Sequence, residues 1–189
     1  MKSYILPAVR VLFVFTLLTG IIYPVTMTLL SLVIFPHQAN GSMIENDGKI
    51  IGSELIGQSF ESEKYFHSRP SAIHYNPIPS GGTNWGPTDK RMADSVKARR
   101  ERYIERNNLP AGTKVPNEIL FASSSGVDPH IPPEAALMQV HRISRARGLD
   151  TGSIKILVER FIEPEQFGLF GDPRVNVVIL NLALDEELH

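Results

Sequence analysis

The residues with the most suggestive chemistry lie in one short segment, "SSSGVDPH", residues 123–130. Ser125, Asp128 and His130 are the residue types of a serine hydrolase, in which histidine takes the serine proton and the carboxylate orients the imidazole. Members of such triads meet in space and are rarely neighbours in sequence, and no G-x-S-x-G motif is present. The same residues also suit turns, as in Asp128-Pro129. A hydrolase built on these three residues is therefore kept as the alternative function.

Metal ligation is a second chemistry that the histidines suggest. The candidate ligands are His67, His74, His130 and His141, together with Asp128. No H-x-x-x-H or H-E-x-x-H spacing connects them, and such spacings are what place two imidazoles on one helix face. We therefore predict no metal site.

The most irregular stretch of the chain is "YNPIPSGGTNWGPTD", residues 75–89, with three prolines, three glycines and the only tryptophan. Gly81 and Gly82 precede a predicted helix and could cradle a phosphate, but the G-K-[ST] element of such loops is missing. Glycines also permit positive φ, asparagines such as Asn84 bond turn backbone, and a tryptophan anchors a loop. We predict a shaped structural loop that Trp85 anchors to the core or to a partner.

An apolar run near the N-terminus must position everything that follows. Residues 11–35 contain no charge, and a helix of this length spans roughly 37 Å against a hydrocarbon core of about 30 Å. The run is too long for a signal peptide and lacks a clear cleavage site. Pro24, with Gly20 one turn before it, predicts a kink in the helix and a site for helix packing. We predict an uncleaved transmembrane helix in contact with lipid.

Flanking charges predict the orientation of this helix. Lys2 and Arg10 precede the run, whereas Glu45 and Asp47 follow it. The positive-inside rule then places the N-terminus in the cytoplasm. The predicted organisation, in chain order, is a cytoplasmic tail (1–10), a transmembrane helix (11–35), a linker (36–47) and an extracytoplasmic domain (48–189).

Composition limits what the outer part can bind. It carries 20 acidic and 17 basic residues, a formal charge of −3, so nothing suggests a nucleic-acid partner. The absence of cysteine fits an exported domain without disulfides. About 150 residues suffice for one hydrophobic core.

The coarse pattern of the outer part predicts an α+β fold. Helical periodicity occurs over residues 89–108, 134–147 and 152–161, while residues 48–60 look like short strand pieces. The segment "RVNVVILNLAL", residues 174–184, is rich in β-branched residues and apolar at both parities, which predicts a central strand covered on both faces. The expected architecture is one transmembrane helix followed by one mixed α+β domain.

Several blocks of the sequence, spread from residue 52 to residue 185, are similar to a known family. In order they are "GSELIGQSF", "YFHSRPSA", "YNPIPSGGTNWGPTD", "SSSGVDPHIPPEAA", "QVHRISRARGL" and "GDPRVNVVILNLALD". With the N-terminal apolar run, they resemble the C subunit of the bacterial high-affinity potassium-transporting P-type ATPase, the Kdp complex. The chain departs from the family pattern at Ser124 and in "IEPEQFG", so the resemblance assigns no role to Ser124, Glu163 or Gln166.

The resemblance implies a non-catalytic subunit of the bacterial inner membrane. Its partners would be a channel-like potassium-translocating subunit and a P-type ATPase subunit, and it would support their assembly and raise the affinity for ATP. ATP is implied only in this way, and the predicted topology makes the effect indirect. The alternative is a membrane-anchored extracytoplasmic hydrolase. Candidate partner-contact or structural residues are Gly20, Pro24, Gly81, Gly82, Asn84, Trp85, Asp128 and His130.

Overall fold

The computed structural model describes residues 2–46 and 48–188, with the backbone alone at Lys2 and Ser3. The chain divides into two compact units, Met1–Ser53 and Glu54–His189, which are described separately. The predicted division into tail, span, linker and outer domain remains a prediction.

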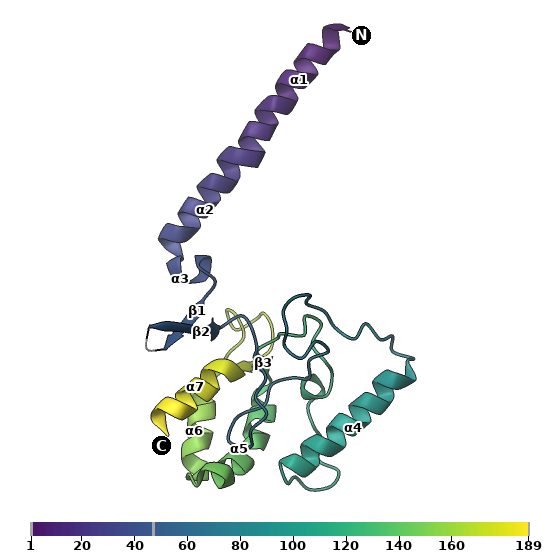
Figure 1. Cartoon of the computed structure of the whole chain (residues 1–189), viewed down its shortest axis with the longest axis vertical. Helices are drawn as coiled ribbons and strands as arrows, with labels where there is room; N and C mark the ends of the chain where they lie inside the picture. The colour runs from purple at the N-terminus through teal and green to yellow at the C-terminus, as the bar shows by residue number, and fades with distance from the viewer. Residues whose placement is uncertain (1, 47, 189) are drawn as a thin grey trace. The chain divides into compact units, whose positions relative to one another are not determined.

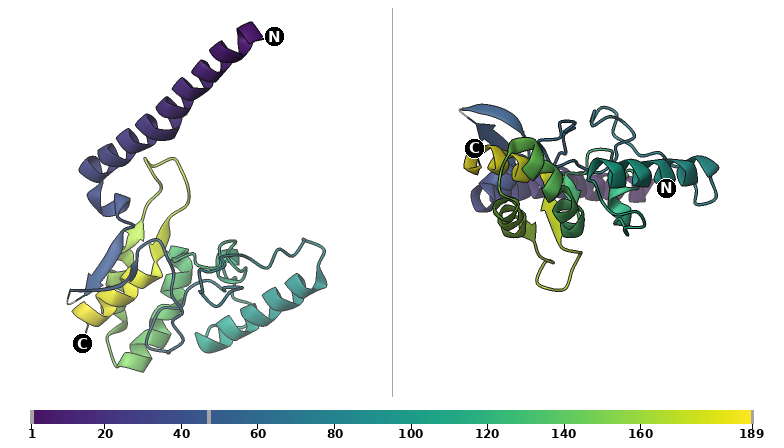
Figure 2. Two further views of the ribbon diagram at one scale, coloured as in Figure 1. Left: turned by 45° about the horizontal axis from the view of Figure 1, so that its top comes forward. Right: turned by 90° about the horizontal axis from the view of Figure 1, so that it is seen from below.

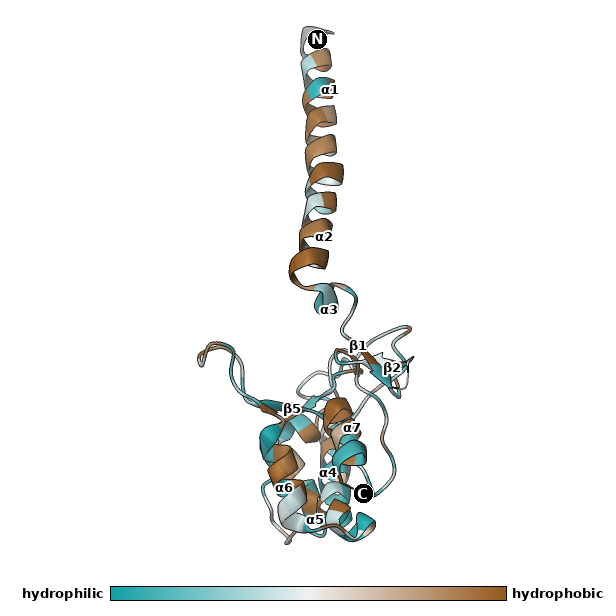
Figure 3. Ribbon diagram, turned by 90° about the vertical axis from the view of Figure 1, so that its left-hand side faces the viewer, coloured by the Kyte–Doolittle hydropathy of each residue, from teal (hydrophilic) through white to brown (hydrophobic). Residues whose placement is uncertain are grey.

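The first unit is dominated by a long apolar helix, shown at the N-terminal end of Figure 1. It comprises α1 (Lys2–Leu17), a π-helical turn η1 (Leu18–Ile22) and α2 (Tyr23–Ile34). Within it, Tyr4–Ile34 has a mean hydropathy of 2.3, and the brown colour of this helix in Figure 3 reflects that value. None of its most apolar stretch is buried. Among the described residues it is the one helix long and apolar enough to span a membrane, which confirms the predicted candidate.

A π-helical turn lies just before Tyr23 and Pro24, next to the place where a kink is predicted, and the kink itself remains a prediction. Pro24 has no N–H to donate, and the Tyr23 N–H bonds the carbonyl of Leu18, five residues back. Gly20 lies inside this turn. Two threonine hydroxyls also bond helix carbonyls, Thr19 to Phe15 at 2.7 Å and Thr28 to the carbonyl of Pro24 at 2.9 Å. These bonds satisfy carbonyl groups inside the apolar segment.

A short helix and a β-hairpin complete the first unit. They are α3 (Pro36–Ala39), β1 (Met43–Asn46) and β2 (Lys49–Ser53), and the two strands pair antiparallel. The Ser53 hydroxyl donates to the Gly41 carbonyl at 2.8 Å, which closes the base of the hairpin. Residues 48–60, predicted to form short strand pieces, thus contain one strand, β2. Its partner, β1, comes before this segment in the sequence.

In the second unit, the three predicted helices are present as α4 (Lys90–Arg106), α5 (Pro133–Arg147) and α6 (Thr151–Arg160). Asp89 and Asp150 cap α4 and α6, each accepting a backbone N–H at 2.8 Å. Such caps satisfy donors that the first helical turn leaves unpaired. These helices pack with strands, so the predicted α+β class is confirmed.

Three very short strands form the sheet of the second unit. They are β3 (His130–Ile131), β4 (Ile162–Glu163) and β5 (Arg174–Asn176), antiparallel in the order β3-β5-β4. A 3₁₀ turn, η2 (Asn117–Ile119), lies between α4 and the sheet in sequence. Figure 2 shows α5 and α6 beside β5 and α7. The core side chains from these elements include Phe66, Ile131, Ala135, Ile143, Ile154, Val158, Val175, Leu180 and Leu184.

The predicted central strand over residues 174–184 is wrong beyond its first three residues. The strand ends at Asn176, and α7 (Val177–Glu187) follows at once. The Asn176 side-chain oxygen accepts the Val178 N–H at 3.0 Å, so it caps this helix. Val177, Leu180 and Leu184 are fully buried at helical spacing. A run that is apolar all round fits a buried helix as well as a buried strand, which is why the pattern misled.

Candidate functional site

Residues 71–89 and 123–130, here called the first and second loops, pack against each other. The Gly81 N–H donates to the Ser125 carbonyl at 3.0 Å, and the Ser71 hydroxyl donates to the Gly126 carbonyl at 2.6 Å. A Cβ on Gly82 would lie 3.1 Å from the Ser124 carbonyl oxygen, so the backbones approach closely there. The structure therefore brings Gly81 and Gly82 together with the segment that holds Asp128 and His130.

Gly126 is the residue that this packing depends on most. Its φ is +75°, a region that favours glycine. A Cβ there would lie 2.4 Å from Cγ1 of Ile73 and 2.8 Å from the Gly81 carbonyl oxygen. No L side chain fits without moving one of the two loops. The sequence analysis did not single out this glycine, although it stands in the quoted "SSSG" run.

Asn84 and Trp85 lie apart from the Asp128 region. Asn84 is exposed with a φ of +53°, and Trp85 is half-buried. The Arg91 guanidinium lies 5.6 Å from the centroid of the Trp85 ring. Trp85 lines a depression of about 250 Å³ with Met92 and Val96 of α4. It therefore packs beside the first half of α4, and its role as an anchor remains a prediction.

A chain of polar side chains with an arginine at each end, here called the charge chain, runs through Asp128 and His130. Arg69 Nη1 donates to Asp128 Oδ2 at 2.7 Å, and His130 Nδ1 lies 3.4 Å from Asp128 Oδ1. On its other side, His130 Nε2 lies 3.9 Å from Glu163 Oε1, and Arg174 Nε donates to the second Glu163 oxygen at 2.9 Å. Burial alone would raise the pKa of Asp128, but hydrogen bonds from His130 and the charge of Arg69 outweigh it and lower that pKa.

This charge chain forms one wall of a cavity of about 610 Å³, a size common among ligand pockets. Its other walls mix basic, acidic and proline residues. Because Arg69 pairs with Asp128 and Arg174 with Glu163, two of its cations are already neutralised. The remaining lining residues include Lys114, Glu118, Glu134, Asp172, Pro116, Pro132, Pro164 and Pro173.

The geometry does not support the serine hydrolase alternative. The Ser125 hydroxyl accepts the Val127 N–H at 3.2 Å, which is a local turn contact. Both ring nitrogens of His130 face carboxylates, so neither is directed at a serine. A hydrolytic triad needs the imidazole to bond the nucleophile on one side and the orienting acid on the other. Asp128 and His130 are brought together, but as parts of the charge chain.

Across residues 2–46 and 48–188, no group of three or more candidate ligands lies close enough to hold a metal ion. His67 in particular is held by protein contacts, since its Nε2 lies 3.0 Å from the Ser62 carbonyl oxygen. Burial, aided by the charge of Arg142, lowers the pKa of His67 to about 4. The imidazole is therefore neutral at ordinary pH.

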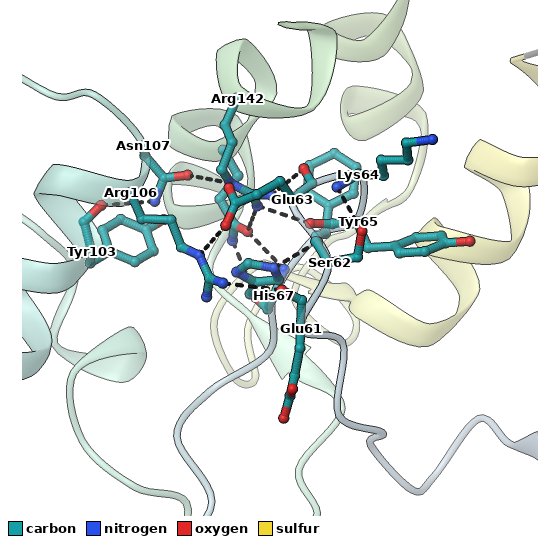
Figure 4. A network of polar contacts seen from close by, with 12 residues as sticks. Glu61, Ser62, Glu63, Lys64, Tyr65, His67, Tyr103, Arg106, Asn107 and Arg142 are labelled. Carbon is teal, nitrogen blue, oxygen red and sulfur yellow. Dashed lines mark hydrogen bonds and ion pairs between the residues drawn. The ribbon is translucent and has the colours of Figure 1, made fainter. Parts of the chain in front are cut away.

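Sequence reasoning missed a buried arginine that organises the segment before the first loop (Figure 4). Arg142, on α5, is only 5% exposed. Its guanidinium donates to the carbonyls of Glu63 and Tyr65, and to the side chains of Asn107 and Gln139. Burial lowers its pKa to about 10, which leaves it charged at neutral pH.

Two buried side-chain amides bond the backbone of this segment, in the way that a neighbouring strand would. The Phe66 N–H and carbonyl bond the Asn181 side chain at 2.8 and 2.9 Å. The His67 N–H and carbonyl bond the Gln139 side chain at 2.8 and 3.2 Å. A sequence signal for these contacts existed, because Gln139 and Arg142 lie on the same helix face as the apolar Ile143 and are buried with it. A polar side chain at a buried helix position indicates that it has hydrogen-bond partners elsewhere in the fold.

These features define a class of protein: one helix that is long and apolar enough to span a membrane, joined to a small α+β unit whose irregular loops are fixed by buried polar contacts. The family model described as "KdpC: K+-transporting ATPase, c chain" matches residues 5–186. The chain belongs to this family, and the resemblance drawn from the quoted sequence blocks is confirmed.

Curated relatives agree along the whole chain. It is 48% identical to a protein of Methylococcus capsulatus, with 98% of each chain covered. It is 47% identical to one of Rhodopseudomonas palustris, again with 98% of each covered, and 43% identical to one of Paraburkholderia phytofirmans, with 100% of each covered. All three are named potassium-transporting ATPase KdpC subunit. The prediction of a subunit of an ATPase rather than a separate enzyme is likewise confirmed.

Proposed function

We propose that the chain is a non-catalytic accessory subunit of an ATP-driven, high-affinity potassium uptake pump. The observation that carries this proposal is the family match across residues 5–186, which includes both compact units. The partners would be a channel-like potassium-translocating subunit and a P-type ATPase subunit. The chain would support assembly of the complex and raise the affinity of the ATPase subunit for ATP.

The location follows from the apolar helix and its flanks. Residues 11–35, most of which belong to the apolar helix Tyr4–Ile34, would cross the bacterial inner membrane once, with the N-terminus in the cytoplasm and the α+β unit outside. An effect on ATP affinity would then be transmitted through the complex. The paired state of Arg69 and Arg174 supports this indirect route, because a triphosphate site needs cations that can turn to the ligand.

The test is to express the pump with and without this chain in a strain that lacks its own high-affinity uptake. We expect the other subunits to co-purify poorly, or their complex to show a raised KM for ATP, when the chain is missing. Potassium-dependent ATPase activity should be lost together with growth at low potassium. Unimpaired pumping and an unchanged KM in its absence would contradict the proposal.

A further inference from the structure

The connection between β4 and β5 ends in an exposed apolar tip, here called the hairpin tip, residues 166–170. Phe167 is 95% exposed, Leu169 76% and Phe170 62%. Figure 2 shows this loop extending from the rest of its unit beyond β4 and β5. Elsewhere in the described part of the second unit, exposed apolar side chains such as Ile78 and Ile156 do not form a cluster of three within four consecutive residues. Clustered exposed apolar groups mark interaction sites more often than scattered ones do.

The hairpin tip is held in one shape. The Gln166 N–H donates to the Phe170 carbonyl at 2.9 Å, and the Phe170 N–H donates back to the Gln166 carbonyl at 3.0 Å. Three residues, 167–169, connect this pair, and the first two of them, Phe167 and Gly168, have positive φ, 58° and 67°, as in a tight hairpin loop. A preformed turn loses little conformational entropy when it binds, so its apolar side chains can contribute to affinity.

The charges beside the hairpin tip indicate what covers it. Residues 162–174 contain Glu163, Glu165 and Asp172 against Arg174 alone, and Arg174 pairs with Glu163. The tip is therefore flanked by net negative charge. Anionic phospholipid surfaces repel such a flank, whereas a protein surface with basic residues around an apolar depression complements it.

We propose that the hairpin tip docks Phe167 and Leu169 into an apolar depression, rimmed by lysine or arginine, on another subunit of the pump. This inference rests on the proposed function, since it requires the complex to exist. The tip would act as a protein anchor of the α+β unit that is separate from the apolar helix. Aromatic anchors seated in a pocket carry a large share of interface affinity.

The test uses the full chain in the assembled complex, in native membranes. One arm places photoreactive benzoylphenylalanine at position 169, and irradiation is expected to give an adduct with another pump subunit. The second arm compares co-purification of Phe167→Ser/Leu169→Ser with that of Ile156→Ser, a control at an apolar residue 65% exposed on α6. We expect the tip variant to reduce co-purified partner by about tenfold or more, and the control to leave it unchanged.

Each outcome separates this inference from the proposed function. If the wild-type chain does not co-purify with any pump subunit, the proposed function fails and the inference with it. If it does, an adduct only with phospholipid, or only with a second copy of this chain, overturns the inference alone. Undiminished co-purification of the tip variant also overturns it. Thermal unfolding of each variant shows whether a loss reflects misfolding, and the cross-linking arm remains informative in that case.

Discussion

Arg142 shows how a single buried charge can shape an irregular segment. Its guanidinium bonds two backbone carbonyls and two side chains, and none of these partners belongs to a regular strand. The two carbonyls, of Glu63 and Tyr65, are part-buried and obtain a donor from this side chain. The arginine thus replaces secondary structure where residues 61–67 cross the helices.

Replacement of this arginine should be costly. We expect Arg142→Ala to lower the free energy of unfolding by about 3 kcal/mol, because four hydrogen bonds of one guanidinium are lost at once and Asn107 Oδ1 is left buried without this donor. Arg145→Ala on the same helix is the control, since Arg145 is exposed, and it should change stability little. Chemical denaturation of the full chain in detergent measures both. Equal effects of the two substitutions would refute the role given to Arg142.

His67 should make stability depend on pH. Its pKa falls from 6.5 to about 4 in the folded chain, mainly through burial, so the unfolded state binds more protons between these values. Stability from this residue is therefore complete above pH 6.5 and is lost as the pH falls toward 4, by roughly 3 kcal/mol in all. Asp128 and Glu63, whose pKa values are lowered, add to acid destabilisation, so the comparison must be with His67→Gln. The wild type should lose more stability than the variant across this interval; parallel curves would contradict the assignment.

At the scale of elements, the two loops behave as one packed unit, and Gly126 tests this. We expect Gly126→Ala to cost about 2 kcal/mol or more, because its Cβ would overlap Ile73 and its φ is positive. Gly86→Ala is the matched control, since a Cβ there meets nothing within 4 Å. Thermal unfolding and limited proteolysis of residues 71–89 would report the effect. A tolerated Gly126→Ala would show that the loops do not need this contact.

Trp85 tests the junction between the first loop and α4. We expect Trp85→Ala to lower stability by about 1–2 kcal/mol or to reduce complex yield, and Trp85→Phe to retain most of both, because a half-buried ring contributes by its area. Yield is measured by co-purification and stability by denaturation. Unchanged stability and yield with a fall only in ATP affinity would instead favour direct contact of the loop with nucleotide.

The elements with clear end signals were predictable from sequence. Asp89 and Asp150 stand before helical periodicity, and Gly148 follows α5 with a φ of 69°, so these boundaries carry local information. For α7 no periodicity was visible, because the core surrounds that helix on several sides. The candidate site was predictable only in part. Asp128 and His130 were identified, but Arg69 and Glu163 reach them from distant segments, and sequence alone gives no such proximity.

At the scale of the whole molecule, the proposed orientation puts the α+β unit on the outer side of the membrane, and this can be tested by labelling. The chain has no cysteine, so single cysteines can report it. We expect Lys155→Cys, at an exposed position on α6, to react with a membrane-impermeant maleimide in intact spheroplasts. Ser3→Cys should react only after lysis. The reverse pattern would invert the proposed orientation and reopen a direct role at nucleotide.

The pairing of Phe66 and His67 with two side-chain amides has a consequence for hydrogen–deuterium exchange. These two backbone amides should exchange slowly although they lie in no helix or strand. Their protection would be controlled remotely, by Asn181 on α7 and Gln139 on α5. Substitution of either side chain should therefore release the exchange of one backbone amide, that of Phe66 for Asn181 and that of His67 for Gln139, while the helices keep theirs. This short segment would then be a local unit of opening within an otherwise cooperative core.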